Sequence, residues 1–482
     1  MAILPAKSDF SEWFTQVVGP EGASLADVRY GVQGFIVHMP YGMRILRRIY
    51  ELLEEEVELD GHEPVLFPTV IKKENLEKEA EHAGFAPDVF WVTKAGTEQL
   101  EEPVALRPTG ETQIYPMFSL WIRSHNQLPM KIYQSRITTF RNEKTTRPFL
   151  RGREFMFFET HNAYAKHSDA EHQIKKDMEI MQRVITKKLM IPFYFFRRTQ
   201  WDKFLGADET FCADTMMPDG KRNQLSSTHD LGTNFAKAYN ITFLDAEGKT
   251  QFAYQTCFGP GIWRIMAALI AVHGDDQGLA LPSVVAPFQV VVVPIFKTEE
   301  EEALVLGAIE ELEQHIHYRY YVDRSKETPG FKFNEWEMRG APVRIELGPN
   351  DLKHGTVIIK RRFGAKLVVK MKDFAAALKE ELHANDEDLH ERAKQYFKDN
   401  TREAETLQEI ARLINEFRGF IITNWCSTAK DGEACAAKLK EATQGAYVCG
   451  ERVDEHQPVK KGAKCAVCGK PATARVYVAK SW

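Results

Sequence analysis

The chain has 482 residues, of which 44% are hydrophobic and 27% charged, and its formal net charge is −5. This length suits two to four domains of about 100–200 residues each, and the composition is typical of a globular protein that buries a sizeable core. The negative net charge excludes a chain that binds nucleic acid through overall basicity, so any RNA contact must depend on local patches.

One basic patch is found between residues 352 and 372. Either an RNA-binding surface or a solvated hairpin face accounts for it, and composition does not distinguish the two. The segment lacks acidic residues and contains Lys353, Lys360, Arg361, Arg362, Lys366, Lys370 and Lys372.

Targeting and membrane patterns are weak. Residues 1–10 lack the basic-then-apolar order of a signal peptide. The uncharged apolar stretch 283–296 is shorter than the about 20 residues that a membrane helix needs. Seven cysteines in a chain of this length do not form a disulfide scaffold. We therefore expect a cytoplasmic protein without a membrane segment.

A helix and a short strand are predicted near the start of the chain. Apolar residues recur at near-helical spacing over residues 45–57, which indicates an amphipathic helix. Gly61 suits its C-terminal cap, and Pro64 and Pro68 prevent its continuation. Residues 65–67, between the two prolines, predict a short strand.

An antiparallel hairpin is predicted from strands at 131–143 and 153–161, joined by the charged loop 144–152. Because strand side chains alternate between faces, polar and aromatic residues would gather on one face of this hairpin. That face suits a polar ligand better than a core, although an edge hairpin with cross-strand Arg–Glu pairs would give the same pattern. The residues are Arg141 and Glu143 on the first strand, and Arg151, Arg153, Phe155, Phe157, Glu159 and His161 on the second.

Residues 275–287, rich in Gly, Ala and Pro, predict a domain boundary. After it, the apolar run 289–296 predicts a buried strand, and a helix at 299–315 begins an alternation of strands and helices that continues to about residue 385. Residues 386–417 are charged and predict a helical segment. We therefore expect domains at 1–282, 283–385 and 386–482.

Three motifs resemble, in the same order, those of class II aminoacyl-tRNA synthetases. The resemblance implies an α/β fold, with an α+β catalytic domain built on an antiparallel sheet flanked by helices, and a homodimer formed through the first motif. The motifs are the helix of residues 41–59 leading to Pro68, Phe140–Glu143 with Arg153–Phe155 after a loop, and Gly259–Arg264 running into an apolar segment.

Further segments resemble prolyl-tRNA synthetases in particular. They imply that L-proline is activated with ATP and transferred to tRNA(Pro), and that an α/β anticodon-binding domain and a small zinc-binding domain follow the catalytic domain. The segments are Arg107–Thr112, Thr228–Phe235, Pro329–Asn334 and Gly340–Glu346. A threonine enzyme of the same fold would need a Cys/His/His zinc set in its catalytic half, which we do not recognise here. A relative without catalysis would not need the arginines of the second and third motifs.

Amino-acid activation brings two anions together, the proline carboxylate and the α-phosphate of ATP. A guanidinium can bind both through its fork of donors, and we assign this catalytic role to Arg141. The resemblance implies that Phe155 and Arg264 hold the adenine, that Glu143 accepts from its amino group and that Arg151 binds the outer phosphates. It places Gln224 and Ser227 at the nucleotide or at the Mg²⁺ that a triphosphate requires.

The resemblance also implies a proline pocket. Thr109 and Glu111 would hold the secondary ammonium group. The ring would be surrounded by Phe157, Phe204, Glu159, His161 and His229. Eukaryotic members have tryptophan where this chain has Phe157. Between Glu154 and Arg264 there is no room for the large editing domain of bacterial members, and we expect misactivation of cysteine and alanine.

The cysteines near the end of the chain predict a metal site. Cys465-x2-Cys468, followed by a glycine, is typical of half of a zinc knuckle. Cys426 and Cys435 are candidates for the other half, with Cys449 as a competitor and unliganded thiols as the remaining alternative. The segment resembles the zinc-stabilised C-terminal domain of archaeal and eukaryotic prolyl enzymes, which usually end in tyrosine where this chain has Trp482.

Overall fold

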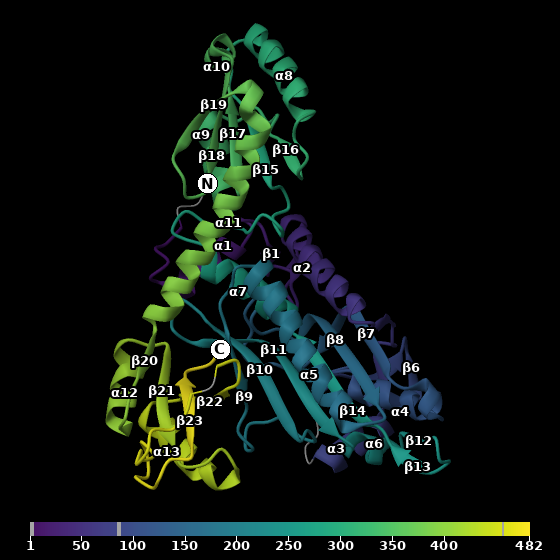
Figure 1. Cartoon of the computed structure of the whole chain (residues 1–482). Helices are drawn as coiled ribbons and strands as arrows, with labels where there is room; N and C mark the ends of the chain where they lie inside the picture. The colour runs from purple at the N-terminus through teal and green to yellow at the C-terminus, as the bar shows by residue number, and fades with distance from the viewer. Residues whose placement is uncertain (1–3, 84–87, 456) are drawn as a thin grey trace.

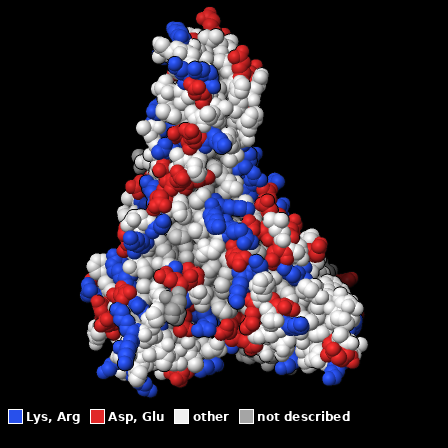
Figure 2. All heavy atoms as spheres, viewed as in Figure 1, with Lys and Arg blue, Asp and Glu red and all other residues white. Residues whose placement is uncertain are grey.

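The computed structural model describes residues 4–83, 88–455 and 457–482. Figure 1 shows an upper module that stands on a wider base, with the long helix α11 (Phe374–Asp399) running from one to the other. Within the described ranges, no helix is both long and apolar enough to cross a membrane. Positive and negative side chains are interspersed over the face seen in Figure 2, and neither sign covers it.

The base is organised around an eleven-stranded sheet of order β20-β21-β23-β22-β9-β10-β11-β14-β8-β7-β3. Its central strands are antiparallel, as the sequence predicted for the catalytic fold. These strands are β7 (Met130–Phe140), β8 (Glu154–Tyr164), β9 (Tyr194–Arg197), β10 (Glu209–Met216), β11 (Arg222–Gly232) and β14 (Tyr254–Pro260). The edge strand β3 (Glu63–Pro64) is parallel to its neighbour β7.

The predicted hairpin is present as β7 and β8, but its ends differ from the prediction: β7 ends three residues earlier than predicted, and β8 continues to Tyr164 instead of ending at residue 161. Arg141 and Glu143 follow the end of β7, and Arg151 and Arg153 precede β8, so these four residues lie in the connecting loop rather than on strands. The loop is held where it leaves the sheet, because the amide of Arg141 donates to the carbonyl of Arg153 over 2.9 Å.

Helices pack against the sheet and form its core. α2 (Pro40–Leu59) is longer than predicted, because Pro40 occupies its first turn, where the missing amide hydrogen costs nothing. It ends before Gly61, whose φ of +85° reverses the chain. The strand predicted at 65–67 is displaced to Glu63–Pro64, which pairs in parallel with β7. Other helices of the base are α1 (Phe10–Val18), α5 (His167–Met181) with its π-helical extension at Gln182–Lys188, α6 (Asn234–Tyr239) and α7 (Ile262–His273).

Short strands and two helices complete this part of the molecule. They are β1 (Ala26–Asp27) with β2 (Val37–His38), β4 (Val70–Lys72) with β5 (Trp91–Ala95) and β6 (Glu98–Leu106), β12 (Thr242–Leu244) with β13 (Thr250–Phe252), and the helices α3 (Lys73–Ala83) and α4 (Glu111–Trp121).

The upper module is the predicted α/β unit. Its five-stranded sheet has the order β16-β15-β17-β18-β19, in which β15 is parallel to both of its neighbours. Val290 and Val292 of β15 and the apolar faces of α8 and α11 contribute to its core, whereas Val291 and Val293 belong to the core cluster of the base. The elements are β15 (Val290–Pro294), α8 (Glu299–Glu313), β16 (Tyr320–Val322), α9 (Pro329–Met338), β17 (Val343–Leu347), α10 (Pro349–His354), β18 (Thr356–Arg361) and β19 (Lys366–Lys370).

The last part of the chain joins the catalytic sheet. Strand β22 pairs with β9, so a strand from the last part of the chain and a strand of the catalytic domain share one sheet. The sequence did not indicate this pairing. The single helical segment predicted at 386–417 is wrong: α11 ends at Asp399 and a strand follows. The elements are β20 (Thr401–Glu403), α12 (Leu407–Glu416), β21 (Phe420–Trp425), α13 (Glu433–Ala442), β22 (Tyr447–Arg452) and β23 (Ala474–Ala479).

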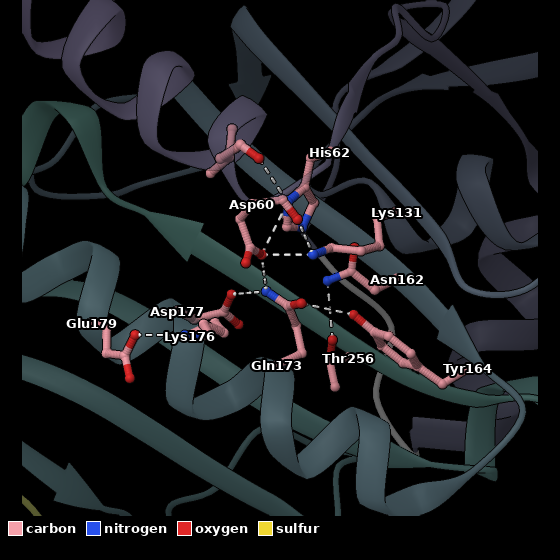
Figure 3. A network of polar contacts seen from close by, with 11 residues as sticks. Asp60, His62, Lys131, Asn162, Tyr164, Gln173, Lys176, Asp177, Glu179 and Thr256 are labelled. Carbon is pink, nitrogen blue, oxygen red and sulfur yellow. Dashed lines mark hydrogen bonds and ion pairs between the residues drawn. The ribbon is translucent and has the colours of Figure 1, made fainter.

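A buried polar network joins α2, α5 and the sheet (Figure 3). Asp60, just after α2, accepts from Lys131 of β7 over 2.7 Å and from Gln173 of α5 over 2.8 Å. Gln173 also donates to Asp177 over 2.9 Å, and Tyr164 of β8 donates to Gln173 over 3.0 Å. The network fixes α5 against the strands that carry the site described next.

Candidate active site

A cavity of about 980 Å³ opens between β8, β11, β14, the N-terminus of α7 and the loop that joins β7 to β8. Every residue that the sequence assigned to nucleotide or proline lies on its wall. These residues are Thr109, Glu111, Arg141, Glu143, Arg151, Phe155, Phe157, Glu159, His161, Phe204, Gln224, Ser227, His229 and Arg264.

Strand β8 supplies the floor of the cavity. Its alternate residues Phe155, Phe157, Glu159 and His161 all line the cavity, whereas Phe158, between two of them, is fully buried in the core. This is the alternation expected for a strand with one face toward a ligand. The rings of Phe155 and Phe157 meet edge to face, with centroids 6.1 Å apart.

One end of the cavity is cationic. Arg141, Arg151 and Arg264 line it together with Glu143, whose carboxylate lies 3.7 Å from Arg151. Burial, with the nearby positive charges of Arg151 and Arg222, lowers the pKa of Arg264 to about 10. Arg264 therefore remains charged at neutral pH, and the converging guanidinium groups favour a polyanionic ligand.

The other end is acidic and almost closed to solvent. Glu111 and Glu159 are 4% and 3% exposed, and they accept hydrogen bonds from Thr109 and Gln134 respectively. Gly110 fits tightly here, since a Cβ atom on it would lie 2.2 Å from a carboxylate oxygen of Glu159. Two buried carboxylates beside His161 favour a cation, and an ammonium group of a ligand can supply it.

Histidines and an aromatic ring complete this end. His161 lies between Tyr115, whose hydroxyl is 3.1 Å from Nδ1, and Glu159, whose carboxylate is 3.1 Å from Nε2. Burial opposes a charge on His161, but Glu159 overcomes this effect and raises its pKa. Burial lowers the pKa of His229 to about 3, so this imidazole is neutral. It packs against Phe204 with ring centroids 4.7 Å apart.

Cys257 is a cavity residue that the sequence reasoning missed. It lies on β14 directly opposite His161 of β8, and its Sγ is 3.7 Å from a carboxylate oxygen of Glu111. Its position two residues before the third motif was the available indication. The catalytic half therefore contains a Glu/His/Cys set, where the threonine alternative required Cys/His/His.

The predicted cysteine site is assembled from distant segments. The Sγ atoms of Cys426, Cys435, Cys465 and Cys468 all lie within 4.8 Å of one another, and those of Cys426 and Cys435 are 3.6 Å apart. Four thiolates at about 2.3 Å from a tetrahedral zinc ion would be roughly 3.7 Å apart, so this set can hold a metal ion. The competitor Cys449 lies elsewhere, beside Arg198, which donates to its carbonyl oxygen.

Family models match three parts of the chain. Residues 90–273 match the model of the tRNA synthetase class II core domain (G, H, P, S and T). Residues 289–381 match an anticodon binding domain, and residues 407–482 match the C-terminal domain of prolyl-tRNA synthetase.

Whole-length relatives extend these matches. The chain is 51% identical to a proline–tRNA ligase of Thermofilum pendens over 98% of both chains, and 42% identical to that of Pyrococcus horikoshii over 96% of both. Among solved structures, that of Giardia lamblia prolyl-tRNA synthetase in complex with prolyl-adenylate is similar over 100% of both chains, with a TM-score of 0.95 and 35% identity.

Proposed function

The chain belongs to the prolyl-tRNA synthetases of class II, and we propose how its cavity performs the reaction of that family. The enzyme activates L-proline with ATP to prolyl-adenylate and pyrophosphate, and then transfers proline to the 3′ end of tRNA(Pro). The observation that carries the assignment of the site is its polarity: one end gathers guanidinium groups and the other gathers buried carboxylates. ATP fits the first end, and the secondary ammonium group of proline fits the second.

Arg141 is proposed to bridge the two substrates. Its side chain is exposed and lines the cavity, so that its fork could bind the proline carboxylate and the α-phosphate together. The reaction needs no side-chain nucleophile, because the carboxylate itself attacks phosphorus and pyrophosphate leaves. The contribution of the protein is positioning and stabilisation of the developing charge.

The nucleotide is assigned to the cationic end. Phe155 and Arg264 are proposed to hold the two faces of adenine, Glu143 to accept from its amino group, and Arg151 to bind the outer phosphates. Gln224 and Ser227 of β11 would contact the nucleotide or its Mg²⁺ ion. Mg²⁺ would neutralise charge on the triphosphate as pyrophosphate departs.

Proline is assigned to the acidic end. Glu111 and Thr109 are proposed to hold its ammonium group, with Glu159 and His161 behind them. Phe157, Phe204 and His229 would surround the ring. Replacing Glu111 with Gln removes the charge but keeps the shape, so we expect the KM for proline to rise while the KM for ATP changes little. An equal rise in both constants in pyrophosphate-exchange assays would contradict this division of the cavity.

The ring pocket also sets the limits of specificity. An aromatic wall excludes larger side chains by clash, but it rejects smaller ones only through lost contacts, and each missing methylene group is worth about 1–3 kcal/mol. The strands, helices and connecting loops of residues 154–264 all belong to the catalytic domain, without a further inserted domain in this fully described segment. We therefore propose that cysteine and alanine are misactivated, cysteine more efficiently, and that the chain does not hydrolyse mischarged tRNA. Rapid deacylation of preformed alanyl-tRNA(Pro) would contradict the second part.

The four-cysteine set is proposed to hold a structural zinc ion. A site with four thiolates has no open position for a substrate. The backbone amide of Lys470 and the neighbouring thiols lower the pKa of Cys468 to about 7, which favours its thiolate. Cys468→Ser should reduce zinc from about one ion per chain, while proline-dependent pyrophosphate exchange largely survives. Full zinc occupancy after replacement of both Cys465 and Cys468 would exclude this assignment.

A homodimer is proposed through the region of the first motif. Leu66, just after β3, is 79% exposed, and Leu120 and Trp121 at the end of α4 are 58% and 37% exposed. The ring of Trp121 lies 5.8 Å from that of Phe67, the chain neighbour of Leu66, so the two segments with exposed apolar side chains lie close together. Leu66→Glu should shift the sedimentation coefficient from that of a dimer to that of a monomer. A wild-type monomer at micromolar concentration would contradict the proposal.

The remaining assignments concern tRNA and location. We propose that residues 1–282 activate proline, that 283–385 bind the anticodon and that 386–482 support both, with α11 shared by the last two units. A cytoplasmic location is proposed, where tRNA is available and thiols stay reduced. Charging of a tRNA(Pro) transcript with radiolabelled proline tests the complete reaction.

A further inference from the structure

Three potential metal ligands converge in the acidic end of the cavity. Glu111 at the start of α4, His161 of β8 and Cys257 of β14 are 4%, 1% and 5% exposed. One ligand atom from each lies within 4.8 Å of the other two. Carboxylate, imidazole and thiol groups are the three ligand types that bind Zn²⁺ in proteins.

The imidazole of His161 is oriented for a cation. Its Nδ1 is 3.1 Å from the hydroxyl of Tyr115, while Nε2 has no hydrogen-bond partner among the described residues. The buried carboxylate of Glu159 lies 3.1 Å from Nε2 and places a negative charge beside this nitrogen. A histidine whose Nδ1 is fixed by a neighbour and whose Nε2 faces a carboxylate can bind a cation at Nε2 in place of a proton.

The separations are close to those of a coordinated ion. Around Zn²⁺, with bonds of about 2.0–2.3 Å, tetrahedral ligand atoms lie roughly 3.3–3.8 Å apart. The Sγ of Cys257 is already 3.7 Å from Glu111. Small side-chain rotations would bring Nε2 of His161 to the same ion as the third ligand. The fourth coordination position would then face the open cavity, where water can bind.

We propose that Glu111, His161 and Cys257 form a binding site for a soft divalent cation of the Zn²⁺ class, and that this cation competes with proline for the acidic end of the cavity. The competition rests on the proposed position of proline. Glu111 cannot bind a metal ion and the ammonium group at once, and two cations held by the same carboxylates repel each other. Bound metal should therefore raise the KM for proline without changing kcat.

Cobalt provides a direct test, because thiolate-bound Co²⁺ absorbs in the near ultraviolet and tetrahedral Co²⁺ in the visible. Enzyme with its four-cysteine site filled by zinc is titrated with Co²⁺. We expect about one further equivalent per chain, with a thiolate band that L-proline abolishes and D-proline does not. Cys257→Ser should remove the band. Cys212→Ser is the matched control, since Cys212 is also a buried thiol on a sheet strand but lies outside the cluster.

Two outcomes would overturn the proposal: wild-type enzyme that takes up no cobalt beyond the four-cysteine site, or a band that persists in Cys257→Ser. If Cys257→Ser does not fold, the test is whether L-proline displaces cobalt from the wild-type enzyme. A cobalt band that L-proline leaves unchanged would contradict the proposed competition. Proline-dependent pyrophosphate exchange, measured without added cobalt, distinguishes a failure of this inference from a failure of the proposed function. Exchange without cobalt binding overturns only this inference, whereas loss of exchange by folded enzyme overturns the proposed function.

Discussion

The guanidinium group of Arg147 lies 5.1 Å from the centroid of the indole ring of Trp482. Arg147 belongs to the loop between β7 and β8, and its carbonyl accepts from the amide of Arg151, which lines the cavity. The indole nitrogen of Trp482 donates to Asp219 over 3.0 Å. The end of the chain is thus tied to the loop that carries a proposed phosphate-binding side chain.

Loss of this contact should affect ATP more than proline. A cation–π contact is worth about 0.5–1 kcal/mol, so Trp482→Ala should raise the KM for ATP by roughly two- to fivefold. Trp482→Phe keeps an aromatic face for Arg147 and should retain most of the wild-type behaviour. Steady-state pyrophosphate exchange at varied ATP measures the effect, and an unchanged KM for ATP in Trp482→Ala would show that the contact does not position the loop.

Arg141 should be needed for its geometry as well as its charge. Arg141→Lys keeps a cation but loses the fork of donors, and Arg141→Ala loses both. A charge-assisted hydrogen bond is worth about 1.5–3 kcal/mol, so the activation rate should fall at least about tenfold in Arg141→Ala. A rate within twofold of wild type would refute the assignment of Arg141 as the bridge between the substrates.

The local patterns of the sequence predicted the catalytic hairpin but not its exact ends. Alternation along β8 was visible in the sequence, because Phe155, Phe157, Glu159 and His161 face a ligand cavity while Phe158 faces the core. The ends of strands are set by pairing with other segments. That pairing places Arg141 and Arg151 in the loop and brings β22 alongside β9, more than 200 positions earlier in the chain.

The residues of the site also divide into those that local sequence motifs predicted and those that only the fold brings in. Residues in short motifs could be assigned by resemblance, and all of those assigned to substrates line one cavity. Cys257 was missed because a single cysteine without a metal-ligand spacing resembles a small apolar core residue. Only the pairing of β14 with β8 places it opposite His161. Likewise, the spacing of the cysteines left Cys449 as an alternative, and the fold directs it to a different core.

The upper module should bind tRNA through lysines that its own acidic groups leave unpaired. Arg361 and Arg362 of the predicted basic patch are paired with carboxylates, as are Lys366 and Arg344 with the buried Glu346. Replacing Glu346 would therefore disturb the sheet. Lys370 and Lys372 are exposed and make no ion pair within the described part of the chain.

Replacing both Lys370 and Lys372 with Glu should raise the KM for tRNA(Pro) several-fold and weaken the dependence of tRNA binding on salt. Proline-dependent pyrophosphate exchange should remain unchanged, since neither lysine lines the cavity and β19, which ends at Lys370, belongs to the upper module in Figure 1. The matched control is Lys297→Glu with Lys326→Glu, an equal change of charge at exposed lysines outside the patch. Equal losses in charging and in exchange would show that these lysines support folding instead.

Asp177 should make stability depend on pH. It is fully buried, one of its carboxylate oxygens has no hydrogen-bond partner among the described residues, and burial, with the charge of Asp60, raises its pKa well above the usual value. A carboxyl group whose pKa is raised by folding stabilises the fold below its unfolded pKa. This contribution is lost as the pH rises through the folded pKa.

Asp177→Asn keeps the acceptor for Gln173 and removes the charge. We expect this substitution to increase the free energy of unfolding of the catalytic part of the protein by about 1–3 kcal/mol near neutral pH. This is the usual cost of a buried polar group without a partner. The gain should shrink as the pH falls toward the unfolded pKa of aspartate. Thermal unfolding at pH 4 to 8 measures it. A variant less stable than wild type across this range would show that the carboxylate is needed in its charged form.

The central claim is that the cavity activates proline and distinguishes it from other amino acids. Its most direct measurement is ATP–pyrophosphate exchange with each of the twenty amino acids in turn, in the presence of Mg²⁺ and without tRNA. We predict that proline gives by far the highest kcat/KM, followed at a distance by cysteine and then alanine, and that Arg141→Ala loses all three activities together. Exchange that is absent with proline, or faster with another amino acid, would contradict the account.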